Sequence, residues 1–167
     1  MKKTKKMVLL SMLVAIALVI YLIEAQIPVL FPGIKLGLAN SISLVALILF
    51  GWKEALLIMV LRTVLGSIFG GGVPALMFSF AGGLLSNIVM ILLYKYFKNS
   101  LSLPIISVCG SVFHNIGQLL VAAFEINNLN IFLYLPVLLI SAIVTGYFIG
   151  ILSNVLKNRL ETILTHM

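Results

Sequence analysis

Three ionisable side chains of the kinds used in catalysis lie within or beside apolar stretches of this sequence. Glu24, Arg62 and His114 could in principle supply an acid, a base and an electrophile. The chain nevertheless contains no Asp, no Walker loop and no paired acidic motif, and its His and Glu residues do not cluster at metal-ligand spacing. We therefore expect a protein that is not an enzyme, with no catalytic residue and no metal site. Any active transport would then depend on a partner or an ion gradient.

Arg62 lies deep within an apolar stretch, roughly 12 Å from either helix end at about 1.5 Å per residue. An arginine at the centre of a membrane costs at least about 2.5 to 3.5 kcal/mol, so it should face other helices or a wet cavity and marks a functional site by default. The alternative is a structural arginine that ties helix ends together through carbonyls or Glu54.

A polar stripe follows one face of the helix predicted near residues 104–125. It consists of Ser107, Ser111, His114, Gln118 and Glu125, at spacings of four, three, four and seven. Asn115 lies at its edge. Such a face cannot contact lipid, so it either holds the helices together or lines a cavity. The group His114, Asn115 and Gln118 favours a cavity.

The segment PGIKLGLAN at residues 32–40 places two glycines and Lys35 directly before a predicted helix. Free backbone N–H groups at a helix start favour an anionic or carbonyl-bearing ligand, although a Pro-Gly pair can also form a simple turn. We expect Asn40 to face the same site. The predicted ligand-binding residues are Lys35, Asn40, Arg62, His114, Asn115 and Gln118.

The composition indicates that these residues are positioned by membrane helices. The 167 residues are 62% hydrophobic and 9% charged, too few polar groups to cover a globule in water. Charges and helix breakers predict an all-α integral membrane protein, one transmembrane domain over residues 1–167. Its six expected helices span about 7–26, 36–50, 53–70, 74–96, 104–125 and 131–156. The single Cys109 excludes a disulfide framework.

The cations predict how this bundle is oriented. With six spans, one side carries Lys2, Lys3, Lys5, Lys6, Lys53, Lys95, Lys98, Lys157 and Arg159, and the other side carries Lys35. The positive-inside rule then places both termini in the cytoplasm of a multi-pass plasma-membrane protein. The clusters adjoin apolar runs, which favours anionic lipid as their partner and argues against nucleic acid.

The basic start and the apolar run 7–23 look like a signal peptide, but no small-residue cleavage site follows, so we expect a retained first helix. On this helix, Ser11 and Ala15 form a small-residue pair that lets another helix approach closely. The partner is either an internal helix or a separate membrane protein.

Several segments together resemble one family, over almost the whole chain and in order. They are PGIKLGLAN at 32–40, FGWKEALL at 50–57, Leu61-Arg62, FSFAGG at 78–83, FHNIGQLL at 113–120 and YLPVLL at 134–139. The chain resembles the heptaprenyl diphosphate synthase component I family, also called the Gx transporter family. That family is similar to the S-components of energy-coupling-factor (ECF) transporters.

The resemblance implies a six-helix protein with cytoplasmic termini that binds a vitamin-like solute from outside. S-components dock on a coupling protein powered by two ATPases through an alanine pair, which Ser11 and Ala15 approximate. Family members are also linked to flavin-based extracellular electron transfer in Gram-positive bacteria, as partners of a second small membrane-associated protein.

We therefore expect an S-component-like subunit that takes a small anionic or vitamin-like solute from the outer face. The alternative is a non-catalytic assembly subunit, either of flavin-based extracellular electron transfer or of a polyprenyl diphosphate synthase. No cofactor is predicted, and flavin and an isoprenoid or quinone precursor remain open as ligands. The synthase description conflicts with the absence of acidic magnesium ligands.

Overall fold

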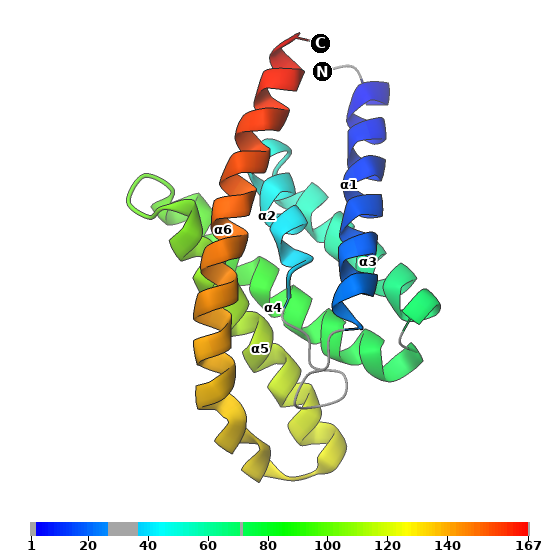
Figure 1. Ribbon diagram of the computed structural model, residues 1–167, viewed down its shortest axis with the longest axis vertical. Helices are drawn as coiled ribbons and strands as arrows, with labels where there is room; N and C mark the ends of the chain where they lie inside the picture. Colours follow the sequence, from blue (N-terminus) through cyan, green and yellow to red (C-terminus); the bar gives the residue numbers. More distant parts are fainter. Residues whose placement is uncertain (1–2, 27–36, 71, 167) are drawn as a thin grey trace.

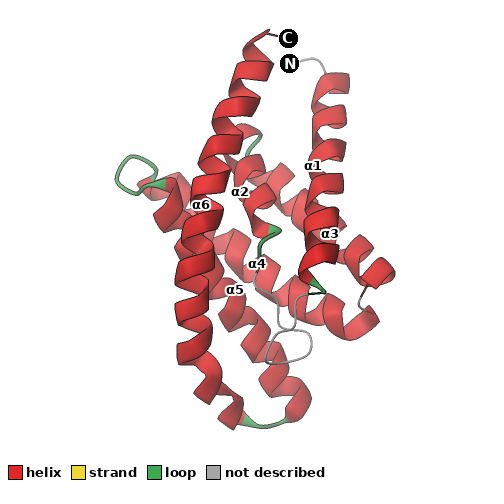
Figure 2. Ribbon diagram, in the orientation of Figure 1, coloured by secondary structure: helices red, strands yellow, loops and turns green. Residues whose placement is uncertain are grey.

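The computed structural model describes residues 3–26, 37–70 and 72–166, and all regular structure in these ranges is helical. The helices are α1 (Lys3–Glu24), α2 (Asn40–Leu49), α3 (Trp52–Gly70), α4 (Gly72–Phe97), α5 (Leu103–Ile126) and α6 (Leu135–His166). A 3₁₀ helix, η1 (Leu129–Tyr134), precedes α6. Figure 1 shows their arrangement, and Figure 2 shows short loops between α2 and α3, between α4 and α5, and between α5 and η1. The predicted all-α fold is therefore confirmed.

Several helix ends differ from the predicted ones. The first helix begins at Lys3, and α2 begins only at Asn40, after the segment 27–36 that lies outside the described residues. The left-handed conformation of Asn127, with φ of 51°, ends α5. The Asn128 side chain then accepts a hydrogen bond from the Asn130 backbone N–H at the start of η1. This local capping, which periodicity does not reveal, inserts a 3₁₀ turn before α6.

Four helical stretches in the described part of the chain are long and apolar enough to cross a membrane. They are Thr4–Glu24, Gly72–Phe97, Leu103–Ile126 and Leu129–Leu160. By contrast, α2 has 10 residues, about 15 Å of helix, and α3 carries three charged side chains. Large apolar side chains also point outward from the bundle, such as Phe124 and Phe148 at 80% and 67% exposure. These features indicate a membrane protein.

The short helix α2 lies at the centre of the bundle. It contacts all five other α-helices, and every residue from Asn40 to Leu47 is buried. Five of its ten residues are Leu or Ile and two are Ser, so it suits a position with neighbours on every side. Among the described residues, the backbones of α1 and α6 do not approach each other, and α2 lies between them.

The cations gather at the end of the bundle where both termini lie (Figure 1), which we call the lysine-rich end. Among the described side chains it carries Lys5, Lys6, Lys53, Lys95, Lys98, Lys157 and Arg159. Trp52 and Tyr96 are exposed there, each beneath a lysine ammonium group. Such aromatic residues are enriched where a membrane meets water.

An ion pair at this end joins α1 to α3. Lys6 Nζ donates to Glu54 Oε1, and both side chains are partly exposed. The contact uses Glu54, which one interpretation of the sequence had offered as a partner of Arg62.

Glycines let the helices approach closely. A Cβ added to Gly117 of α5 would lie 2.8 Å from the Ala81 carbonyl oxygen of α4. A Cβ added to Gly150 of α6 would lie 2.3 Å from Pro104 Cα of α5. Small residues at such crossings allow van der Waals contact along the backbone, which drives helix association in membranes.

The Gly150→Ala substitution should loosen the crossing of α5 and α6. The added methyl group meets backbone that cannot move aside alone, and overpacking of this kind costs about 1 to 3 kcal/mol. The Tm of the purified protein in detergent should fall by several degrees. The control Asn154→Ala lies at an exposed position of the same helix and should leave Tm unchanged. Equal Tm values for the Gly150→Ala variant and the wild type would contradict the close approach.

Candidate functional site

Arg62 is buried in the interior of the bundle, where it contacts α2. Its side chain is 2% exposed, and its Nη2 donates to Asn40 Oδ1 at 2.5 Å. Asn40 is the first residue of α2, so this hydrogen bond fixes the start of α2 against the middle of α3. The arginine therefore has the internal partner that its predicted depth requires.

Glu24 brings a negative charge to the same region from the end of α1. The carboxylate is 3% exposed, accepts a hydrogen bond from the Gly37 backbone N–H and interacts electrostatically with the Arg62 guanidinium. Because Gly37 precedes α2 by three residues, Glu24 ties the end of α1 to the turn that leads into α2. A buried carboxylate held in this way partly balances the buried arginine.

The turn before α2 passes directly beside α5. Gly37 has φ of 81°, a conformation that favours glycine. A Cβ there would lie 2.9 Å from His114 Cδ2 and 3.2 Å from Asn40 Nδ2. Only a glycine at this position brings the chain so close to the imidazole.

The glycine pair of α4 packs against the same polar side chains. A Cβ added to Gly82 would lie 2.9 Å from both His114 Cε1 and Gln118 Cγ. A Cβ added to Gly83 would lie 3.5 Å from Arg62 Nη2. The arginine of α3 and the polar face of α5 therefore pack on adjacent residues of α4.

Ser86, one turn further along α4, joins the same group, because Asn40 Nδ2 donates to its Oγ at 3.3 Å. We call this group the polar cluster. It consists of Glu24, Asn40, Arg62, Ser86, His114 and Gln118, all of them buried.

Two buried polar atoms in this region make no hydrogen bond within the described part of the chain. Arg62 Nε and Asn87 Oδ1 are buried and have no hydrogen-bond partner among the described atoms. Buried polar atoms are nearly always satisfied in proteins, so such atoms call for an explanation. A guanidinium with a spare donor is suited to a carboxylate or phosphate oxygen.

One predicted ligand residue, Asn115, is not part of this cluster. Asn115 is buried, but its Nδ2 donates to the Leu138 carbonyl oxygen at 2.8 Å, which ties α5 to α6. Lys35 belongs to the segment outside the described residues. The stripe on α5 is buried from Ser107 to Gln118, whereas Glu125 is exposed beyond it.

The predicted docking pair on α1 faces outward. Ser11 and Ala15 are both exposed, and Ser11 Oγ donates within its own helix to the Met7 carbonyl oxygen. Ser11 also lines a furrow of about 310 Å³ between α1 and α3. The pair is thus available to a separate membrane protein, and no internal helix covers it among the described residues.

Some contacts of this region were not predicted. Tyr21 is 1% exposed, and its hydroxyl lies 3.1 Å from Ser79 Oγ. A Cβ added to Gly66 of α3 would lie 2.3 Å from the Tyr21 ring. Tyr21 precedes Glu24 by three residues and so shares its helix face, a spacing that could have indicated its inward direction.

No group of three or more His, Cys, Asp or Glu side chains within residues 3–26, 37–70 and 72–166 could hold a metal ion. The polar cluster combines one cation, one carboxylate, two amides, an imidazole and a hydroxyl. This chemistry suits recognition of a polar or anionic group through hydrogen bonds.

The Asn40→Ala substitution should destabilise the protein by leaving the Arg62 guanidinium without its acceptor. Loss of a buried hydrogen bond to a charged group costs about 1.5 to 3 kcal/mol. Adding Arg62→Met should recover part of this loss, because it removes the stranded charge and keeps an apolar chain.

Thermal unfolding of the purified variants in detergent would measure both effects. The control Asn115→Ala removes one neutral hydrogen bond and should cost only about 1 kcal/mol. If Arg62→Met lowers Tm as much in the Asn40→Ala background as in the wild type, the two side chains are not coupled.

Comparison with known proteins assigns the chain to a family. The family model described as heptaprenyl diphosphate synthase component I matches residues 13–156. No curated protein and no solved structure matches the chain. The matched range includes every member of the polar cluster. The chain belongs to the heptaprenyl diphosphate synthase component I family.

Proposed function

We propose that this protein is a membrane subunit that binds a small anionic or vitamin-like solute at the polar cluster. The observation that supports it best is the buried Arg62 guanidinium, which is held by a neutral amide and retains a donor without a partner among the described atoms. In a bundle that only needed to be held together, apolar packing would serve as well without the cost of burying an arginine.

The arrangement around Arg62 supports a site that opens beside the turn before α2. The Gly37 N–H and the Glu24 carboxylate lie on one side of it, and His114 lies directly against the turn. Lys35 precedes this turn by two residues in the sequence and would add a second cation. An anionic ligand group would then meet charge from α3 and from the loop.

The proposed topology has six spans with both termini in the cytoplasm. The lysine-rich end would face the cytoplasm by the positive-inside rule, and the ends of α1 and α3 near the polar cluster would face outward. A solute would therefore enter from outside. Ser11 and Ala15, both exposed on the cytoplasmic half of α1, would contact a coupling protein with ATPases, as in S-components.

A second candidate follows from the family description. A synthase component implies a partner subunit, and a membrane protein without acidic metal ligands would serve such a partner without doing chemistry. In this case the protein would be a non-catalytic membrane subunit of a polyprenyl diphosphate synthase, and the polar cluster would stabilise the bundle only.

Gentle purification from the native membrane, followed by mass spectrometry of retained proteins and metabolites, distinguishes the two candidates. The wild type should retain an anionic metabolite, and Arg62→Ala and Gln118→Ala should lose it because both remove polar groups of the cluster. The control Asn115→Ala should retain it, because Asn115 bonds to Leu138.

Each variant must elute from size exclusion as the wild type does. An empty wild-type site with a copurifying prenyl synthase would support the second candidate. Retention of the same metabolite by both Arg62→Ala and Gln118→Ala would refute the assignment of the site.

A further inference from the structure

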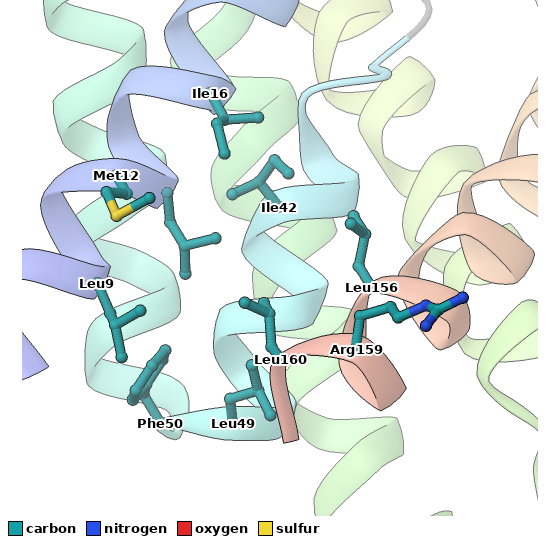
Figure 3. A pocket seen from close by; sticks show the side chains of 10 residues that line it. Leu9, Met12, Ile16, Ile42, Leu49, Phe50, Leu156, Arg159 and Leu160 are labelled. Atoms are coloured by element: carbon teal, nitrogen blue, oxygen red, sulfur yellow. The ribbon is translucent and has the colours of Figure 1, made fainter. Parts of the chain in front are cut away.

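A hollow lies toward the opposite end of α2 from the polar cluster. It is a groove of about 150 Å³ between α1 and α6, with α2 as its floor (Figure 3). Met12 and Ile16 of α1, Phe50 after α2, and Leu156 and Leu160 of α6 contribute to its walls. The lining is apolar except for one residue, Arg159 of α6.

The groove exists because α2 is too short to fill the space between its neighbours. α1 has 22 residues and α6 has 32, whereas α2 has 10. Figure 1 shows α1 and α6 continuing toward the lysine-rich end beyond the end of α2. Since the backbones of α1 and α6 do not approach each other in the described ranges, a space remains between them beside the last turn of α2.

The size and lining of the groove select its occupant. An α-helix with side chains is about 10–12 Å across, too wide for a hollow of this volume. A polar solute would gain no hydrogen bonds from aliphatic walls. A single hydrocarbon chain entering from the surrounding lipid is much narrower than a helix and matches the apolar lining.

Arg159 provides the second observation, which concerns charge. Its aliphatic stem lines the groove, and in Figure 3 its guanidinium points away from the apolar side chains. It is exposed and belongs to the lysine-rich end, as does the exposed Lys5 of α1. A guanidinium at the rim of an apolar groove is placed to bind a phosphate with two parallel hydrogen bonds.

We propose that this groove holds one acyl chain of an anionic phospholipid whose phosphate binds Arg159. The lipid belongs to the leaflet at the lysine-rich end, where clustered cations attract anionic headgroups. The acyl chain fills the space that α2 leaves open between α1 and α6, whose backbones do not approach each other in the described residues. This inference does not depend on the solute proposed for the polar cluster.

Native mass spectrometry of the full-length protein with added phosphatidylglycerol or phosphatidylcholine tests the proposal. The wild type should bind one phosphatidylglycerol in preference to phosphatidylcholine. Arg159→Gln should weaken phosphatidylglycerol binding about tenfold, as expected for loss of a charge-assisted hydrogen bond. The control Lys98→Gln removes an exposed cation of the same end that does not line the groove, and it should leave binding unchanged.

A second variant tests the groove itself. Met12→Trp enlarges an exposed side chain at the groove wall and should block binding of either lipid without disturbing buried packing. Its Tm in detergent without added lipid should match that of the wild type. Any of three results would overturn the proposal. They are equal affinity of the wild type for both lipids, an equal loss of phosphatidylglycerol binding in Arg159→Gln and Lys98→Gln, and full lipid binding by Met12→Trp.

Discussion

The hydrogen bond between Arg62 and Asn40 is the contact on which the rest of this structure depends. A guanidinium in the middle of an apolar bundle must be satisfied internally, since lipid offers no acceptor. The acceptor comes from the first residue of α2, and the Glu24 carboxylate provides compensating charge from α1. Three helices are thereby fixed at one depth, and the glycine pair of α4 and the polar face of α5 close around them.

The sequence was sufficient to predict the order of the helices, the burial of Arg62 and the buried face of α5 from Ser107 to Gln118. These features follow from hydropathy and periodicity, which depend only on nearby residues. Periodicity does not say which neighbour a buried side chain meets. Asn115 lies one residue from His114 and was expected in the same site, but the 100° turn between consecutive residues directs it to Leu138 of α6.

Other contacts depend on packing between distant segments and could not be read from local patterns. The close approach of Tyr21 to Gly66 joins positions far apart in the sequence, as does the ion pair of Lys6 and Glu54. The left-handed Asn127 and the cap at Asn128 are local, but their effect on the start of α6 required the three-dimensional chain path. Membrane orientation, by contrast, is predicted from charge, and the described cations other than the buried Arg62 do lie at one end.

The central position of α2 links the polar cluster to the apolar groove. Asn40 at its first residue bonds Arg62, and Ile42 and Leu49 line the groove. The polar cluster and the groove suit different ligands, because the cluster consists of charged, amide and other polar side chains and the groove is lined mainly by aliphatic ones. A polar solute and a lipid chain would therefore not compete for the same space. Both sites share the same short helix, so any movement of α2 along its axis would alter the Arg62 contact and the groove together.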